Sequence, residues 1–226
     1  MAKETIRIGL DQAPPIPLHT SFSGPAFGGY EVELVEQLAS TLDLDILYSE
    51  APWPELLRKL EAGDIDAICS AATITTERQQ YLRFSAPYLS FHLALVCRED
   101  HLITTDHLRE HPVGVRIDTT AEEYLLSKLY QPPAFRSDSN DELYNLLLNG
   151  VIHGIIDDSP IAQGYIELHP ELSIAAMLPG PAHEYAMAFN PNRSDLSDKI
   201  DSALQQLQEA GFLHQLQEKW FGRTPL

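Results

Sequence analysis

Short runs rich in Ile and Val alternate along this chain with longer segments in which apolar residues recur at helical spacing. Ile6 to Leu10 has the composition of a strand, and the apolar residues from Val32 to Leu42 follow a helical period before a second strand at Leu44 to Tyr48. This order is typical of α/β proteins with largely parallel sheets, so we predict an α/β fold.

The same alternation continues along the chain. Trp53 and Pro54 begin a helix that stops at Gly63, and the run from Ile65 to Ser70 has the composition of a buried strand. The elements predicted after it are strands at Val113 to Val115, His153 to Ile156 and Tyr185 to Phe189, and amphipathic helices at Leu196 to Ala210 and Phe212 to Phe221.

Helix starts are marked by two capping boxes, at Thr119 with Glu122 and at Ser139 with Glu142. A third start is predicted at Ser159-Pro160, with Ser159 as the N-cap and the proline at the first helical position.

Polar residues follow two of the predicted strands. Thr119 and Thr120 follow the Val113 strand, and Asp157 and Asp158 follow the His153 strand. The carboxyl edge of a parallel sheet is where open α/β folds bind ligands, so we expect a binding site among these groups.

The charge balance excludes one class of partner. Fifteen Lys and Arg stand against thirty-three Asp and Glu, a net charge of −18 at pH 7. Such a chain repels a phosphate backbone and an anionic lipid surface, so we expect no nucleic-acid partner.

The chain carries no obvious membrane or disulfide signal. The apolar run at Leu93 to Cys97 is stopped by charged residues, and Met1 leads almost directly into the first strand, so we expect a cytoplasmic protein or one whose leader has been removed. Cys69 and Cys97 lie in apolar runs without a redox spacing, and we expect both to be buried thiols.

A series of short segments, in a fixed order, resembles the bacterial periplasmic amino-acid-binding proteins, extracellular solute-binding protein family 3. The segments are Gly29 to Leu34, Trp53 to Leu57, Gly63 to Ile68, Thr73 to Arg78, Phe84 to Tyr88, Val113 to Thr120, Gly150 to Pro160 and Gly211 to Gly222. Each is weak alone, but their order over nearly the whole chain is a strong signal.

The resemblance implies a two-lobed clamshell of the type II periplasmic-binding-protein kind, in which each lobe is an α/β sandwich. It implies a first lobe of residues 1–90 and 187–226 and an inserted second lobe of residues 91–186. The ligand, a small zwitterion such as an amino acid, is expected between the lobes and to stabilise their closed form.

The function implied is a non-enzymatic, monomeric, periplasmic protein that needs no cofactor and delivers its ligand to the membrane subunits of an ABC transporter. Two alternatives stay open. The first is the sensor domain of a larger receptor. The second is an enzyme similar to cyclohexadienyl dehydratases, but Leu93 and Ile161 are apolar at the positions where those enzymes carry a lysine and a carboxylic acid.

A site that desolvates a zwitterion needs a cation for its carboxylate and an acid for its ammonium. The resemblance assigns the first role to Arg78 and the second to Asp158. The alternatives are a solvated helix arginine beside Glu77, a helix cap at Asp158, and Asp157 in place of Asp158.

The remaining candidates complete the polar shell and the wall of the site. The Thr120 amide, at a helix start capped by Thr119, is a second donor to the carboxylate. The other ligand-binding candidates are Ser70, Thr73, Trp53 as an aromatic wall, Asp11 at the end of the first strand, and Arg116 as a reader of the ligand side chain.

Two features depart from the family pattern. No aromatic residue stands between Asp11 and Ile16, where one usually covers the ligand, and Phe22 or Phe27 is the candidate substitute. Asp118 replaces the glycine that usually precedes the threonine pair, which places a negative charge near the carboxylate site.

The histidines give no firm metal site. His101, His107 and His111 are close in sequence, and His107 and His111 are spaced to share one helix face. Without further ligands we expect a solvated face and no bound metal.

Overall fold

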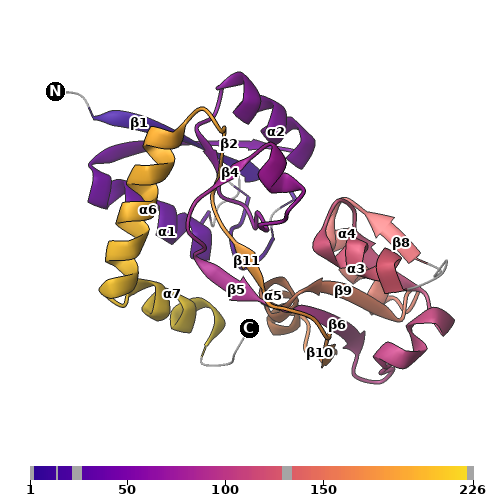
Figure 1. Ribbon diagram of the computed structural model, residues 1–226. Coiled ribbons are helices and arrows are strands. Elements are labelled where there is room, and N and C mark those ends of the chain that lie inside the picture. The colour runs from indigo at the N-terminus through magenta and orange to yellow at the C-terminus, as the bar shows by residue number, and fades with distance from the viewer. Residues whose placement is uncertain (1–2, 14, 22–26, 129–133, 223–226) are drawn as a thin grey trace. The chain divides into compact units, whose positions relative to one another are not determined.

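The structure is a computed structural model that describes residues 3–13, 15–21, 27–128 and 134–222 (Figure 1). It divides into two compact units. Unit 1 comprises Met1–Ser90 and His183–Pro225, and unit 2 comprises Phe91–Ala182. The chain therefore enters unit 2 once and returns once.

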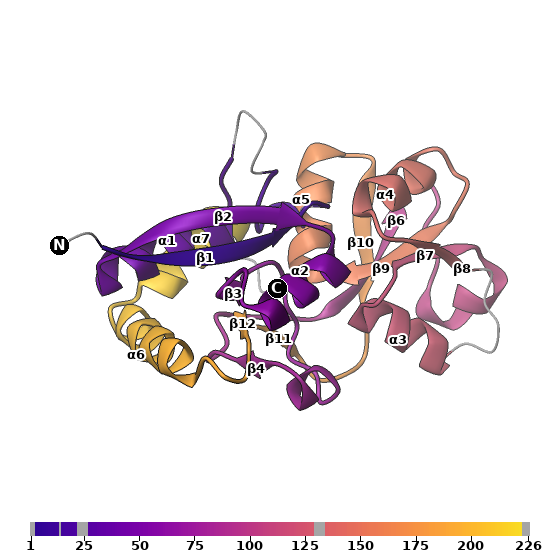
Figure 2. The same ribbon diagram turned by 90° about the horizontal axis from the view of Figure 1, so that it is seen from above.

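The sheet of unit 1 has the strand order β2-β1-β3-β12-β4. Its first three strands are parallel, and β12 is antiparallel to both of its neighbours. Figure 2 shows β1 and β2 as long strands lying side by side. The bounds are β1 Glu4–Asp11, β2 Leu44–Ala51, β3 Ala67–Ile68, β4 Arg83–Phe84 and β12 Ala188–Phe189.

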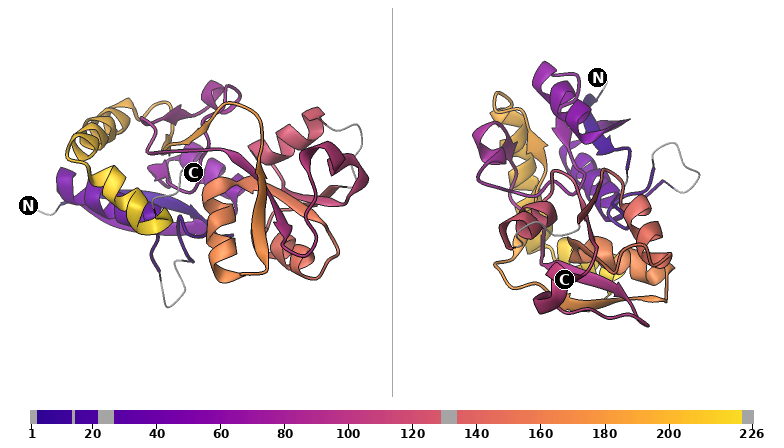
Figure 3. Two further views of the ribbon diagram at one scale, coloured as in Figure 1. Left: turned by 90° about the horizontal axis from the view of Figure 1, so that it is seen from below. Right: turned by 90° about the vertical axis from the view of Figure 1, so that its right-hand side faces the viewer.

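The helices of unit 1 cover this sheet with their apolar stripes. Helix α1 contacts β2 and the two last helices, α6 and α7, as Figure 3 shows. Helix α2 buries Leu56 and Leu60 in a cluster with Ile65 and Ile68. The bounds are α1 Tyr30–Leu42, α2 Trp53–Ala62, the 3₁₀ turn η1 Arg78–Gln80, α6 Ser194–Glu209 and α7 Phe212–Phe221.

The sheet of unit 2 has the order β10-β6-β9-β7-β8, in which β9, β7 and β8 are parallel and β6 is antiparallel to both of its neighbours. Helices α3, α4 and α5 pack against it. The bounds are β6 Leu93–Arg98, the 3₁₀ helix η2 Thr105–Glu110, β7 Val113–Arg116, α3 Thr120–Lys128, β8 Ala134–Ser137, α4 Asn140–Leu148, β9 Gly154–Asp158, α5 Ser159–Leu168 and β10 Leu172–Met177.

The segment predicted as one strand at Tyr185 to Phe189 is instead two strands, β11 His183–Tyr185 and β12. Strand β11 pairs with β5, Leu89–Phe91, in a separate two-stranded sheet. The N–H of Ile74 also donates a 2.9 Å hydrogen bond to the carbonyl of Glu184, and Thr73 forms a bridge to Tyr185. These bonds place residues 183–186 in unit 1, although we predicted them at the end of the inserted lobe.

The predicted α/β class is confirmed, with one departure in detail. The sheets are largely parallel, as predicted, because one strand of each, β12 or β6, runs against the other four. Asp158, and not Ser159, is the N-cap of α5, so Pro160 lies one position deeper than predicted. Cys69 and Cys97 are free and buried, as expected. Across the described ranges, no helix combines the length and the apolar composition needed to cross a bilayer.

Candidate functional site

At the carboxyl edge of the unit 1 sheet, β1 and β3 end side by side. Asp11 is the last residue of β1, and its backbone N–H donates a 3.0 Å hydrogen bond to Oγ of Ser70. Nε2 of His19 lies 2.7 Å from the same Oγ, and all three side chains are buried. We did not predict His19, because an isolated histidine outside any periodic segment carries no signal in the sequence.

Arg78 lies at the start of η1, near the same edge, and two contacts orient its guanidinium. Nη1 donates a 3.1 Å hydrogen bond to the carbonyl of Thr73, and the guanidinium carbon lies 5.1 Å from the centroid of the Trp53 ring. The backbone N–H of Arg78 donates to Oγ1 of Thr75 at 3.1 Å. This half-buried, stacked arginine differs from the solvated one that was the alternative, and it lies together with Trp53 and Thr73.

At the carboxyl edge of the unit 2 sheet, the parallel strands β7 and β9 end as neighbours. Oγ1 of Thr119 accepts a 3.3 Å hydrogen bond from the N–H of Glu122, so the predicted cap of α3 is present. Thr120, the first helical residue, is 6% exposed, and within the described ranges its Oγ1 has no hydrogen-bond partner. Its N–H is among the first of the helix, which lack acceptors inside it.

Asp157 and Asp158 end β9, and their environments differ. Asp157 accepts hydrogen bonds from the hydroxyl of Tyr144 at 3.1 Å and from the N–H of Asp158 at 2.9 Å. Burial, and then the neighbouring Asp158 carboxylate, raises the pKa of Asp157 well above its ordinary value. Asp158 is 8% exposed and is the N-cap of α5, but its side chain makes no capping hydrogen bond. The capping alternative for Asp158 therefore does not account for its carboxylate.

Arg116 and Asp118, the other two residues that the sequence singled out in this region, both make hydrogen bonds in unit 2. Arg116 ends β7, and its Nε donates a 3.1 Å hydrogen bond to the carbonyl of Asp138. Asp118 is exposed and has a φ of 57°, in the left-handed region that favours glycine. Its N–H donates to Oε2 of Glu122 at 2.9 Å. The conformation explains why glycine suits this position and why Asp, which tolerates it better than most residues, can replace it.

The predicted residues thus form two clusters, one at the carboxyl edge of each sheet. Asp11, Trp53, Ser70, Thr73 and Arg78 belong to unit 1, and Arg116, Thr119, Thr120 and Asp158 belong to unit 2. Of the candidate substitutes for the missing aromatic wall, Phe22 lies outside the described residues. The ring of Phe27 packs edge-on against Tyr48, with 5.0 Å between the ring centroids.

The histidine group differs from the predicted one. The 3₁₀ helix η2 ends at Glu110, and His111 after it is extended, so no helix face joins His111 to His107. The side chain of His107 lies outside the described part of the structure. His153, distant in sequence, instead joins His101 and His111.

Leu93 and Ile161, the two positions compared with the dehydratases in the sequence, are buried and apolar. Leu93 is 5% exposed and pairs in register with Asp158, and Ile161 is 4% exposed in α5. Neither side chain can transfer a proton.

Comparisons with known proteins agree over nearly the whole chain. The family model described as bacterial extracellular solute-binding proteins, family 3, matches residues 6–223. The L-cystine-binding protein TcyJ of Escherichia coli strain K12 is 30% identical over 224 residues, which cover 96% of this chain and 83% of that protein. The arginine-, lysine-, histidine-binding protein ArtJ from Geobacillus stearothermophilus has a TM-score of 0.88 at 25% identity, covering 98% of this chain and 97% of that one.

One solved structure relates to an enzyme. The ancestral amino-acid-binding protein AncCDT-1, a precursor of cyclohexadienyl dehydratase, has a TM-score of 0.86 at 24% identity, covering 96% of this chain and 95% of that one. At that identity the likeness shows a shared fold. The matching family model and the relatives named above are of binding proteins.

Proposed function

The chain belongs to the bacterial extracellular solute-binding proteins of family 3, and we propose that its solute is a free amino acid, which it delivers in the periplasm to the membrane subunits of an ABC transporter. The named relatives bind L-cystine in one case and arginine, lysine and histidine in the other, which supports an amino-acid ligand. We propose further that the protein acts as a monomer and catalyses no reaction, and the apolar side chains of Leu93 and Ile161 support the second point.

The observation that most supports an amino-acid ligand is the orientation of the Arg78 guanidinium. Its contacts with the Thr73 carbonyl and the Trp53 ring hold the guanidinium plane in one direction. A held guanidinium can meet a carboxylate with two parallel hydrogen bonds, a geometry that a lysine does not offer. In our proposal Arg78 binds the α-carboxylate, and the Thr120 N–H at the start of α3 is a further donor to it.

The other end of the zwitterion requires an acid. We assign the ammonium to Asp158, because Asp157 is occupied by Tyr144 and by the backbone and its raised pKa favours the neutral form. In this proposal unit 1 supplies the cation and unit 2 the acid, while Ser70, Thr73, Asp11, Thr119 and Arg116 complete the polar shell and Trp53 forms an apolar wall.

Titration calorimetry with the twenty common amino acids and L-cystine tests the proposal. We expect saturable binding of at least one of them. A charged hydrogen bond contributes roughly 1.5–3 kcal/mol, so Arg78→Ala and Asp158→Asn should each weaken that binding at least about tenfold.

Arg58→Ala and Asp106→Asn are matched controls, because both residues are exposed, on α2 of unit 1 and on η2 of unit 2. Both controls should bind as the parent does. Absence of heat with every ligand of the panel would contradict the amino-acid proposal, and unchanged affinity in Arg78→Ala would contradict the assignment of the carboxylate.

A further inference from the structure

Three histidines meet at one edge of the unit 2 sheet. His101 follows the end of β6, His111 precedes β7 and His153 directly precedes β9. Strand β6 is antiparallel to β9, and β7 is parallel to it, so the end of β6 and the starts of β7 and β9 lie at the same edge. The topology, rather than any sequence motif, brings the three side chains together.

The ring nitrogens are close enough to share one ion. One nitrogen from each histidine lies within 4.8 Å of the others. The Nδ1 atoms of His111 and His153 are 3.0 Å apart, and the ring centroids of His101 and His153 are 4.4 Å apart. A pocket of about 150 Å³ adjoins His101 and His153 and is lined by these two residues together with Arg98, Leu147, Gly150 and Ile152.

We propose that His101, His111 and His153 form a binding site for a divalent transition-metal ion with a preference for imidazole nitrogen, such as zinc. Zinc–nitrogen bonds of about 2.0–2.1 Å in a tetrahedron place two ligand nitrogens roughly 3.3–3.4 Å apart. The His111–His153 pair is already near that separation. His101 is exposed, so its side chain can turn to complete the set, and the adjoining pocket leaves room for a water molecule as the fourth ligand.

The charges around the cluster are compatible with a cation. The guanidinium of Arg98 is held by the carboxylate of Asp100 through bonds of 2.9 and 2.8 Å, which offsets its positive charge.

This site is distinct from the proposed amino-acid site. His153 precedes β9 and Asp158 ends it, and a strand of five residues spans about 16 Å. The metal site therefore lies at the amino edge of β7 and β9, and the proposed ligand residues of unit 2 lie at their carboxyl edge. An ion bound there would tie the ends of three strands together and stabilise unit 2.

The test uses the full chain without a histidine tag, freed of metal with EDTA and titrated with ZnCl₂ alone in a calorimeter. We expect one equivalent to bind. His153→Ala, His101→Ala and His111→Ala should each weaken binding at least about tenfold, because each removes one direct ligand. Thermal unfolding with and without ZnCl₂ should show a higher midpoint for the zinc-bound parent and a smaller rise for the three variants.

His214→Ala is the control, because His214 is an exposed histidine on α7 of unit 1. This variant should bind zinc as the parent protein does. His101→Ala removes an exposed side chain, so its fold should persist and its result is decisive even if His153→Ala does not fold. Absence of zinc binding, or equal binding by the parent and His101→Ala, would overturn the proposal.

Discussion

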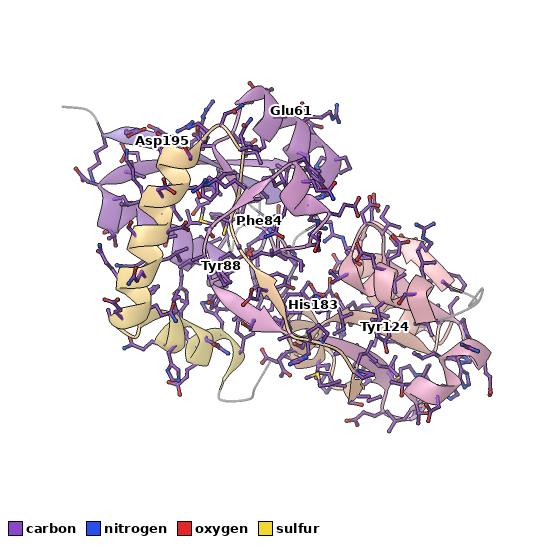
Figure 4. The ribbon with its side chains drawn as sticks, in the orientation of Figure 1. Glu61, Phe84, Tyr88, Tyr124, His183 and Asp195 are labelled. Carbon is purple, nitrogen blue, oxygen red and sulfur yellow. The ribbon has the colours of Figure 1, made fainter. Side chains whose placement is uncertain are left out.

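At the scale of single residues, the least ordinary group outside the two clusters is Glu31 on α1. It is fully buried, and its Oε1 accepts hydrogen bonds from the N–H of Ala71 at 2.7 Å and from the hydroxyl of Tyr88, which Figure 4 labels. Its Oε2 has no hydrogen-bond partner within the described residues. Burial raises the pKa of Glu31 to about 7, because the two bonds to Oε1 compensate only part of the lost hydration.

This pKa predicts a pH dependence of stability. Between the ordinary pKa of 4.5 and about 7, the folded protein holds a proton on Glu31 that the unfolded chain has released. Stability from this group is therefore fully present below pH 4.5 and is lost as the pH rises toward 7. Relative to Glu31→Gln, the parent should lose about 3 kcal/mol between pH 4.5 and pH 8. Urea unfolding of both proteins at several pH values measures the difference, and parallel pH profiles would contradict the prediction.

At this scale the sequence suggests candidate residues but not their environments. Arg78 and Asp158 could be chosen because the resemblance to the family assigns them the carboxylate and the ammonium of a zwitterion. The stacking of Arg78 on Trp53 could not be predicted, because it depends on the path of the chain between Thr73 and η1. The same holds for the His101, His111 and His153 cluster, since β9 lies far from β6 in sequence and only the sheet order makes them neighbours.

At the scale of elements, the two sheets have the same plan. In each sheet one strand, β1 or β7, lies between two parallel neighbours and contains a glycine. The helix α2, which follows β2, packs against Gly9, and the helix α4, which follows β8, packs against Gly114. A Cβ on Gly9 would lie 2.6 Å from Cδ1 of Ile65 and 2.9 Å from Cδ2 of Leu56, and Gly114 is similarly close to Leu143 on α4. Both helices approach their sheets closely because these positions have no side chain.

Gly9→Ala should therefore destabilise the protein, even though alanine itself is tolerated in strands. Ile65 and Leu56 are buried and have little space to move, and overpacking of this kind costs about 1–3 kcal/mol. Urea unfolding measures the loss. Gly28→Ala is the matched control in unit 1, because a Cβ there would meet no atom of the described residues within 4 Å. If Gly9→Ala lost no more stability than Gly28→Ala, the close contacts of Gly9 with Ile65 and Leu56 would not restrict the size of this residue.

Some elements were missed because they are short. Strands β4 and β5 have two and three residues, too few for a period of two to be detected. The antiparallel strands could not be assigned to a sheet either, because β12 joins unit 1 only after the chain has passed through all of unit 2. The long helices and β1 carried strong periodicity, and their predicted positions agree with the structure to within a few residues.

At the scale of the whole molecule, the net charge of −18 means that negative charges repel one another in the folded protein and lower its stability. Salt shortens the range of that repulsion, to a Debye length of about 3 Å at 1 M. We expect the midpoint of thermal unfolding to rise from low salt to 0.5 M NaCl, by about 2–4 °C for each kcal/mol gained. KCl should act like NaCl, since screening depends on ionic strength. A midpoint that falls with added salt would show that attractive surface pairs outweigh the repulsion.

The interrupted course of unit 1 has a consequence for biosynthesis. Strand β12 lies between β3 and β4, so the first sheet lacks an inner strand until residue 189 has left the ribosome. Unit 2 is one continuous stretch and has all its strands by residue 177. During translation the inserted unit is therefore able to complete its sheet first, whereas the sheet of unit 1, whose first strands are made earlier, still needs residues 188–189.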